Sequence, residues 1–201
     1  MGKTSRSRLF ALALLTCCLT PLIVTAQSIT YTETFDASGT VNGSPFDGMV
    51  TFSLSSTVSQ IMGTCMGIGG LYCTPDTTAT FSIQGVGQGT FTNQFWVFDN
   101  QSNAVAGFSA VGIEDIVDLS NSAFSTYDLK SPIGPLNSTF FFTDNGVMLG
   151  SSLGNVVFDS FSGVPVFEAS ESGTTPEPSS LVLFGSGLVG LATAVRRKLK
   201  A

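Results

Sequence analysis

Short runs in which apolar and polar residues alternate fill the middle of the chain, and they constrain the fold more than any other feature. Ile29, Tyr31, Glu33 and Phe35 form one such set, with a threonine at each position between them. A period of two residues is that of a β-strand, whereas an amphipathic helix has a period near 3.6. Residues 28–170 contain no helix-length amphipathic segment. The other runs are 50–54, 81–83, 91–98, 104–111, 123–129, 138–143, 155–161 and 164–169.

Turn signals separate several of these runs. They are the pairs Asn42-Gly43, Asp47-Gly48 and Asn145-Gly146, which favour two-residue β-turns. About ten strands in a segment of this length predict an all-β domain over residues 27–170. We expect a β-sandwich or a jelly-roll-like architecture.

The N-terminus has the three parts of a secretory signal peptide. Lys3, Arg6 and Arg8 precede an apolar stretch over residues 9–19, and small residues follow at Val24-Thr25-Ala26. We therefore expect signal peptidase to remove residues 1–26, between Ala26 and Gln27. Two alternatives are an uncleaved membrane anchor and a lipoprotein modified at Cys17. The first is disfavoured by the short apolar stretch, and the second by the threonine before Cys17.

The C-terminus also has three parts. A linker at 171–180 contains Pro176, Glu177 and Pro178, an uncharged segment follows at 179–195, and a basic tail occupies 196–201. The uncharged segment has the minimum length for a single C-terminal transmembrane helix. Positive charges at the end of such a helix stay in the cytoplasm, so the acidic domain would lie outside. These topology-setting residues are Arg196, Arg197, Lys198 and Lys200.

This C-terminal pattern resembles the PEP-CTERM sorting signal over residues 174–201. The resemblance implies that an exosortase, an integral-membrane protease or transpeptidase, recognises the tail. It also implies cleavage near Pro176–Pro178 and release or transfer to the surface of a Gram-negative bacterium that makes extracellular polysaccharide. The protein would first be anchored in the inner membrane and later be at the cell surface or extracellular. The resemblance covers the tail and says nothing about the domain before it.

Charge and missing residue types exclude several functions. All fourteen acidic residues lie between Glu33 and Glu177, and Lys130 is the one cation in residues 9–195. Such a segment repels phosphate backbones, so we expect no nucleic-acid binding. The chain has no histidine, which excludes Ser-His-Asp and Cys-His catalysis. A Ser–Lys pair could use only Lys130 beside Ser131, and a glycosidase carboxylate pair stays open. We expect no enzyme and no cofactor.

Two cysteines remain after removal of the leader, Cys65 and Cys73. An exported domain is exposed to oxidising conditions, so we expect a disulfide between them. A zinc site would need further thiol or imidazole ligands.

Two clusters of oxygen-bearing side chains could bind calcium. One contains Glu114, Asp115 and Asp118, and the other is Asp144-Asn145-Gly146. Neither matches the twelve-residue EF-hand pattern. We favour solvated turn carboxylates and predict no metal site.

The consecutive residues Phe95, Trp96, Val97 and Phe98 predict a central strand that is buried on both faces. The alternative is a sugar-stacking platform around Trp96 and Tyr72.

Taken together, these features favour a non-enzymatic surface or matrix protein. The alternative is a carbohydrate-binding module, whose partner would be extracellular polysaccharide.

Overall fold

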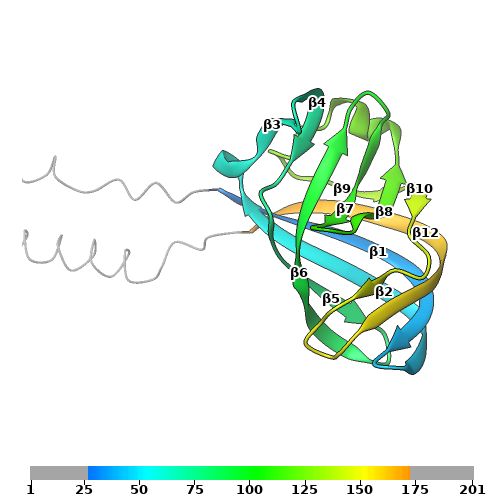
Figure 1. The fold of residues 1–201 in the computed structure, drawn as a ribbon. Helices are drawn as coiled ribbons and strands as arrows, with labels where there is room; N and C mark the ends of the chain where they lie inside the picture. The colour runs from blue at the N-terminus through cyan, green and yellow to red at the C-terminus, as the bar shows by residue number, and fades with distance from the viewer. Residues whose placement is uncertain (1–26, 173–201) are drawn as a thin grey trace, which may run out of the picture.

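The computed structural model describes residues 27–172, which Figure 1 shows as a ribbon. Strands dominate these residues, and no α-helix occurs among them. Two short 3-10 turns, η1 (Val58–Gln60) and η2 (Ser122–Thr126), interrupt the strands. The strands are β1 (Ser28–Val41), β2 (Ser44–Thr57), β3 (Met62–Cys65), β4 (Ile68–Cys73), β5 (Thr77–Ile83), β6 (Gly87–Asn100), β7 (Val105–Ala110), β8 (Glu114–Ser120), β9 (Ile133–Asn137), β10 (Thr139–Thr143), β11 (Met148–Leu149) and β12 (Val156–Ser172).

All twelve strands belong to one hydrogen-bonded sheet with the order β10-β8-β7-β6-β5-β2-β1-β12-β11 along its main path. The β3–β4 hairpin joins the sheet through β6, and β9 pairs with β12. Because β9 and β10 follow each other in the chain, the β9–β12 and β10–β8 pairings bring the two ends of the sheet together. Between them, the N–H of Ser138 donates to the carbonyl of Pro165 at 2.8 Å. The sheet is therefore nearly closed around one core (Figure 1).

The predicted all-β class is confirmed, but the predicted architecture is corrected. A sandwich or a jelly roll has two sheets packed face to face, whereas here a single sheet curls until its ends meet. Register shifts accompany this curvature, for example in the β1–β12 pair between Thr34 and Asp36 and between Ser38 and Gly39. Such irregularities bend a strand and increase its twist.

The predicted transmembrane helix at 179–195 lies outside the described residues. Among residues 27–172, no helix is long and apolar enough to span a bilayer.

The core lies inside the curled sheet and is rich in phenylalanine. On β1 every second residue from Ile29 onward is buried, as the alternation predicts. Phe52 on β2 is fully buried, and edge-to-face contacts join it to Phe35 at 5.3 Å, Phe91 at 5.2 Å and Phe158 at 5.6 Å between ring centres. Such aromatic pairs add to the free energy that burial of their area provides.

The run 123–129 was predicted as a strand, and this prediction is wrong. The segment forms η2 and the turn after it, because local side chains bond to its backbone. Asn121 Oδ1 accepts from the N–H of Ala123 at 3.0 Å, and Ser125 Oγ donates to the carbonyl of Ser122 at 2.7 Å. Asn and Ser side chains compete with strand pairing in this way. Phe124, Tyr127 and Leu129 of the run are still buried and belong to the main core.

Two of the three predicted turns are confirmed. Asn42-Gly43 connects β1 to β2 with both residues at positive φ, and Asn145-Gly146 is also a turn. The third, Asp47-Gly48, is wrong because it lies within β2, where Gly48 pairs with Ala37. The chain has already reversed at Asn42-Gly43, so pairing continues through Gly48. The runs 155–161 and 164–169 form one strand, β12.

Candidate functional site

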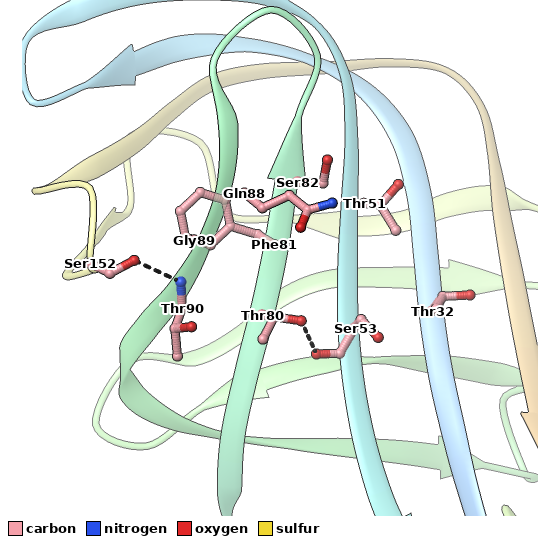
Figure 2. Close-up of a pocket in the computed structure, with 10 residues that line it drawn as sticks. All are labelled: Thr32, Thr51, Ser53, Thr80, Phe81, Ser82, Gln88, Gly89, Thr90 and Ser152. Carbon is pink, nitrogen blue, oxygen red and sulfur yellow. Dashed lines mark hydrogen bonds between the residues drawn. The ribbon is translucent and has the colours of Figure 1, made fainter. Parts of the chain in front are cut away.

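The outer surface of strands β1, β2, β5 and β6 is lined with hydroxyl side chains (Figure 2). Thr32 pairs with Ser53, Ser53 with Thr80, and Thr80 with Thr90, so one row of hydroxyls crosses four strands. This row exists because polar residues occupy the outward positions of strands whose inward positions hold the core. A second row runs through Thr34, Thr51, Ser82 and Gln88.

These rows line a shallow hollow of about 450 Å³. Ser152, from the segment after β11, borders the hollow, and its Oγ accepts from the N–H of Thr90 at 3.0 Å. Gly89 leaves room for the Phe81 ring, because a Cβ there would lie 2.4 Å from Phe81 Cζ. No ionisable side chain lines this hollow. Hydroxyl groups donate and accept hydrogen bonds, so the surface suits a neutral, hydroxyl-bearing ligand. We call it the hydroxyl face.

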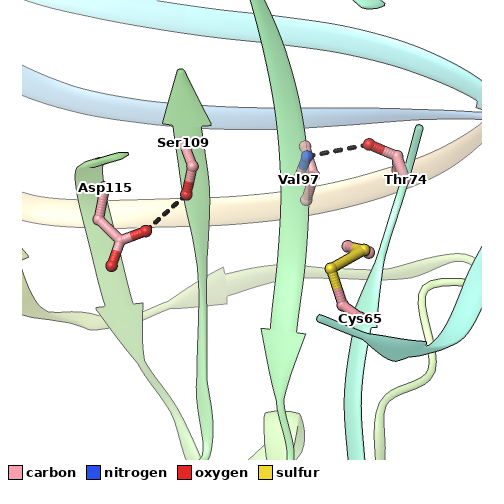
Figure 3. Close-up of a disulfide and its surroundings, with 6 residues drawn as sticks. Cys65, Thr74, Val97, Ser109 and Asp115 are labelled. Carbon is pink, nitrogen blue, oxygen red and sulfur yellow. Dashed lines mark hydrogen bonds between the residues drawn. A yellow bond between two sulfur atoms is a disulfide. The ribbon is translucent and has the colours of Figure 1, made fainter. Parts of the chain in front are cut away.

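The β3–β4 hairpin extends the sheet beside β6, because β4 pairs with β6, and it is closed by a disulfide between Cys65 and Cys73 (Figure 3). Their Cα atoms lie 5.7 Å apart. The bond packs against Phe98 and Val105 in a small second core, with Trp96 at its side. The sequence predicted a bond between these two cysteines but not the two strands that carry them. Glycines interrupt the alternation of apolar and polar residues in this segment.

A second hollow of about 250 Å³ lies beside this disulfide. Thr74 directly follows the hairpin and links it to β6 through two hydrogen bonds to Val97. Thr74 donates its N–H to the Val97 carbonyl at 2.9 Å, and its Oγ1 accepts from the Val97 N–H at 3.0 Å (Figure 3). The apolar lining includes Met62, Met66 and Trp96.

Trp96 and Tyr72 do not form a shared sugar-stacking platform. Cys73 pairs with Phe98 and Tyr72 with Asp99, so the two aromatic residues belong to opposite faces of the sheet. Tyr72 packs against the main core, whereas Trp96 packs against the disulfide cluster. The other interpretation, a strand buried on both faces, agrees with the burial of Phe95, Val97 and Phe98.

The first acidic cluster lies on strand β8 and not in a turn. Asp115 Oδ1 accepts a hydrogen bond from Ser109 Oγ at 2.6 Å (Figure 3), and Asp118 is buried. Asp144 belongs to the second cluster, directly before the Asn145-Gly146 turn. Within residues 27–172 no three acidic or cysteine side chains group closely enough to hold a metal ion.

Among the described side chains of residues 27–172, three carboxylic ones are buried: Glu33, Asp99 and Asp118. Within the described residues, neither carboxyl oxygen of Glu33 or Asp99, nor Asp118 Oδ1, has a hydrogen-bond partner. Burial raises the pKa of Asp99 to about 8, with a further contribution from the charge of Asp128. Burial and then Asp115 likewise raise the pKa of Asp118 to about 8.

Burial, and then the charge of Asp118, raise the pKa of Glu33 well above its usual value. These groups favour the protonated form because a buried charge without a partner is costly. Neither hollow is lined by any of the three. The sequence contains a signal for the burial of Glu33. This residue alternates in phase with the apolar residues of its run and therefore occupies an inward position of β1.

Lys130, the cation of the possible Ser–Lys pair, lies near an aromatic ring. Its Nζ lies 5.9 Å from the centre of the Tyr72 ring. The neighbouring Ser131 accepts a bond from Tyr127 Oη through its backbone carbonyl at 3.0 Å.

The predicted processing residues lie almost entirely outside the described part of the chain. Gln27 is exposed and directly precedes β1. Ala26, the sorting residues Pro176, Glu177 and Pro178, and the basic residues Arg196, Arg197, Lys198 and Lys200 are not among residues 27–172.

Comparison with known proteins identifies the tail. Residues 174–198 match the family model of the PEP-CTERM protein-sorting motif. No curated protein and no solved structure matches the chain. The resemblance inferred from the sequence is therefore confirmed for the tail. The motif implies export and recognition by exosortase, a membrane enzyme.

Proposed function

We propose that the chain is a non-enzymatic protein of the bacterial surface or extracellular matrix that exosortase processing delivers. The match at residues 174–198 carries the proposal. Signal peptidase would produce Gln27 as the new N-terminus. Exosortase would then cut near Pro176–Pro178, so that the basic tail and the segment at 179–195 act as a temporary anchor.

The chemistry of the domain supports a role without catalysis. The chain lacks histidine, and Lys130 is the one cation of the exported segment. The buried carboxyls Glu33, Asp99 and Asp118 line neither of the hollows described above. Acid–base catalysis needs a titrating group within reach of a bound substrate. The first hollow is lined by no ionisable side chain, and the second by the single carboxyl of Asp76.

Intact-mass analysis of the protein from its own cells tests delivery. The expected mass corresponds to a chain from Gln27 to the Pro176–Pro178 region in cells with a working exosortase. Deletion of the exosortase should leave a chain that ends at Ala201 and sediments with the inner membrane. A mature chain that retains Ala201 in cells with the enzyme would show that the tail is a permanent anchor.

A carbohydrate-binding function is the second candidate, and the hydroxyl face is the observation that favours it. Its hollow has the size and the neutral hydrogen-bonding groups for a few sugar units, although no aromatic ring is exposed on its rows. Affinity electrophoresis in gels that contain the host's extracellular polysaccharide tests this. Thr32→Val with Thr80→Val should abolish retardation, whereas Thr139→Val on β10 should leave it unchanged. Equal retardation of both variants would exclude the face as the binding site.

A further inference from the structure

The β3–β4 hairpin and the adjoining β7–β8 turn expose apolar side chains that have no structural explanation within the domain. Met66 is 77 % exposed, Ile68 54 %, Met62 46 % and Val111 43 %. Met62, Met66 and Val111 line the hollow beside the disulfide together with Trp96, and Asp76 is the one ionisable residue of the lining. Ile68 pairs with Cys65 across the hairpin turn. We call Met62, Met66, Ile68 and Val111 the hairpin patch. Contiguous exposed apolar groups of this kind mark sites of interaction.

The turn at the tip of the hairpin has a residue at its first left-handed position that does not favour a tight turn. Met66 adopts φ 52° and Gly67 φ 78°, the two left-handed positions of a tight hairpin turn. Asn or Gly usually occupies the first of these positions, and a long side chain is uncommon there. A methionine that accepts this backbone conformation and remains exposed is better explained by a contact with a partner than by the turn.

The hairpin lies beside the point where the chain leaves the domain. Ser28 pairs with both Thr57 and Ser172, and the N–H of Val58 donates to the carbonyl of Gln27 at 2.9 Å. From there η1 leads directly into β3, and Figure 1 shows the hairpin at the end of the sheet where β1 starts. Six residues, 173–178, separate β12 from the uncharged segment at 179–195. Even fully extended, they span only about 20 Å.

We propose that the hairpin patch docks on the outer surface of the inner membrane while the tail is anchored. The inference rests on the proposed function, because the anchored tail is what brings the bilayer within reach. Met, Ile, Val and Trp suit the boundary between headgroups and acyl chains. A few half-exposed side chains bind membranes weakly on their own, but a short tether supplies a high effective concentration. Docking holds residues 173–178 at the membrane surface, where exosortase acts.

The charge of the domain determines which lipids it prefers. Lys130 is the one cation between residues 9 and 195, against fourteen acidic side chains. A surface of this kind is repelled by anionic headgroups, and salt screens the repulsion. Docking should therefore be strongest on zwitterionic lipid, and weaker on phosphatidylglycerol at low salt. After cleavage the tether is lost, and the mature protein leaves the membrane.

Trp96 provides a direct probe, because it is the only tryptophan in the chain and lines the hollow. The full-length chain is reconstituted in phosphatidylcholine vesicles that contain lipids brominated near the headgroup. We expect quenching of Trp96 fluorescence. Met66→Ser with Ile68→Ser should lower the ratio of docked to undocked domain about tenfold. Met148→Ser is the matched control, because Met148 is 60 % exposed and pairs with Val157 at the far end of β12.

The outcomes separate the two proposals. Co-sedimentation with vesicles reports the anchor, and Trp96 quenching reports docking. A chain that co-sediments without quenching, or whose quenching is the same in the Met66→Ser/Ile68→Ser variant, overturns the docking proposal and leaves the sorting function standing. A chain that does not co-sediment overturns the anchor and docking together. Quenching that increases with phosphatidylglycerol would also contradict the inference.

Discussion

Gly107 on β7 lies directly opposite Asp118 on β8, and a Cβ at Gly107 would come within 2.5 Å of Asp118 Oδ1. The same Cβ would lie 2.6 Å from the backbone carbonyl oxygen of Val117. The missing side chain at Gly107 therefore provides the space that the buried carboxyl occupies. Backbone atoms cannot move aside as a flexible side chain can.

Gly107→Ala should therefore destabilise the mature protein by about 2–3 kcal/mol, because the added methyl overpacks a rigid site. Urea unfolding measures the change in the free energy of unfolding. Gly69→Ala on β4 is the control, since a Cβ there meets no atom within 4 Å. An equal effect of the two substitutions would contradict this explanation.

The buried carboxyls should make the protein less stable as the pH rises. Asp99 has a pKa of about 8 in the folded state and about 3.8 when unfolded. Between these values the folded state holds more protons, so the free energy of unfolding decreases with increasing pH. Asp118 contributes in the same window and the same direction. The slope approaches about 1.4 kcal/mol per pH unit for each group.

Asp99→Asn removes one of these contributions. It should raise the free energy of unfolding at pH 8 by roughly 2–5 kcal/mol, with little change at pH 4. Thermal or urea unfolding across this pH range measures the effect. Asp159→Asn, at an exposed position of β12, is the matched control. A wild-type profile that rises between pH 4 and pH 8 would show that Asp99 is charged in the folded state.

The Cys65–Cys73 bond should resist alkylation and stabilise the domain. The mature, unreduced protein should incorporate no thiol reagent after unfolding, and two equivalents after reduction. Replacing both cysteines by serine should lower the free energy of unfolding by about 2.5 kcal/mol, the loop-closure estimate for about nine residues. Labelling of both cysteines before reduction would disprove the pairing in the cell.

The Pro-Glu-Pro segment should be required for processing. Replacement of Pro176, Glu177 and Pro178 by alanine should leave a membrane-bound precursor that ends at Ala201, because proline favours the extended backbone that a protease cleft binds, and alanine does not. Gel mobility and intact mass measure whether the precursor is cleaved. Alanines at Ser170, Glu171 and Ser172, outside the matched residues 174–198, should leave cleavage unaffected. Normal release of the first variant would mean that another feature of the tail is recognised.

The alternation of apolar and polar residues predicts the long strands well, because a strand that buries one face needs an apolar residue at every second position. β1 is the clearest case, and even the inward position of Glu33 follows from it. The hairpin around Cys65 and Cys73 could not be predicted in the same way. Its glycines carry no pattern, and its strands form because the disulfide and the pairing with β6 hold them.

The closure of the sheet and the state of its acidic residues were also beyond the sequence. Closure depends on β9 and β10 pairing with strands far away in the chain, β12 and β8. Asp118 was expected on the surface, but Gly107 across the strand pair lets it lie within the protein. Relationships of this kind depend on which strands become neighbours.

Strand β12 gives the domain a defined mechanical response. In a chain that is held by its C-terminus, tension on the domain enters at Ser172, the last residue of this 17-residue strand. Because β1 pairs with β12 over almost its whole length, a pull along the strand axis loads many hydrogen bonds in parallel. A pull between Gln27 and Ser172, which leave side by side, would instead open the same ladder one pair at a time. Single-molecule pulling in the two geometries should therefore show a higher rupture force in the first.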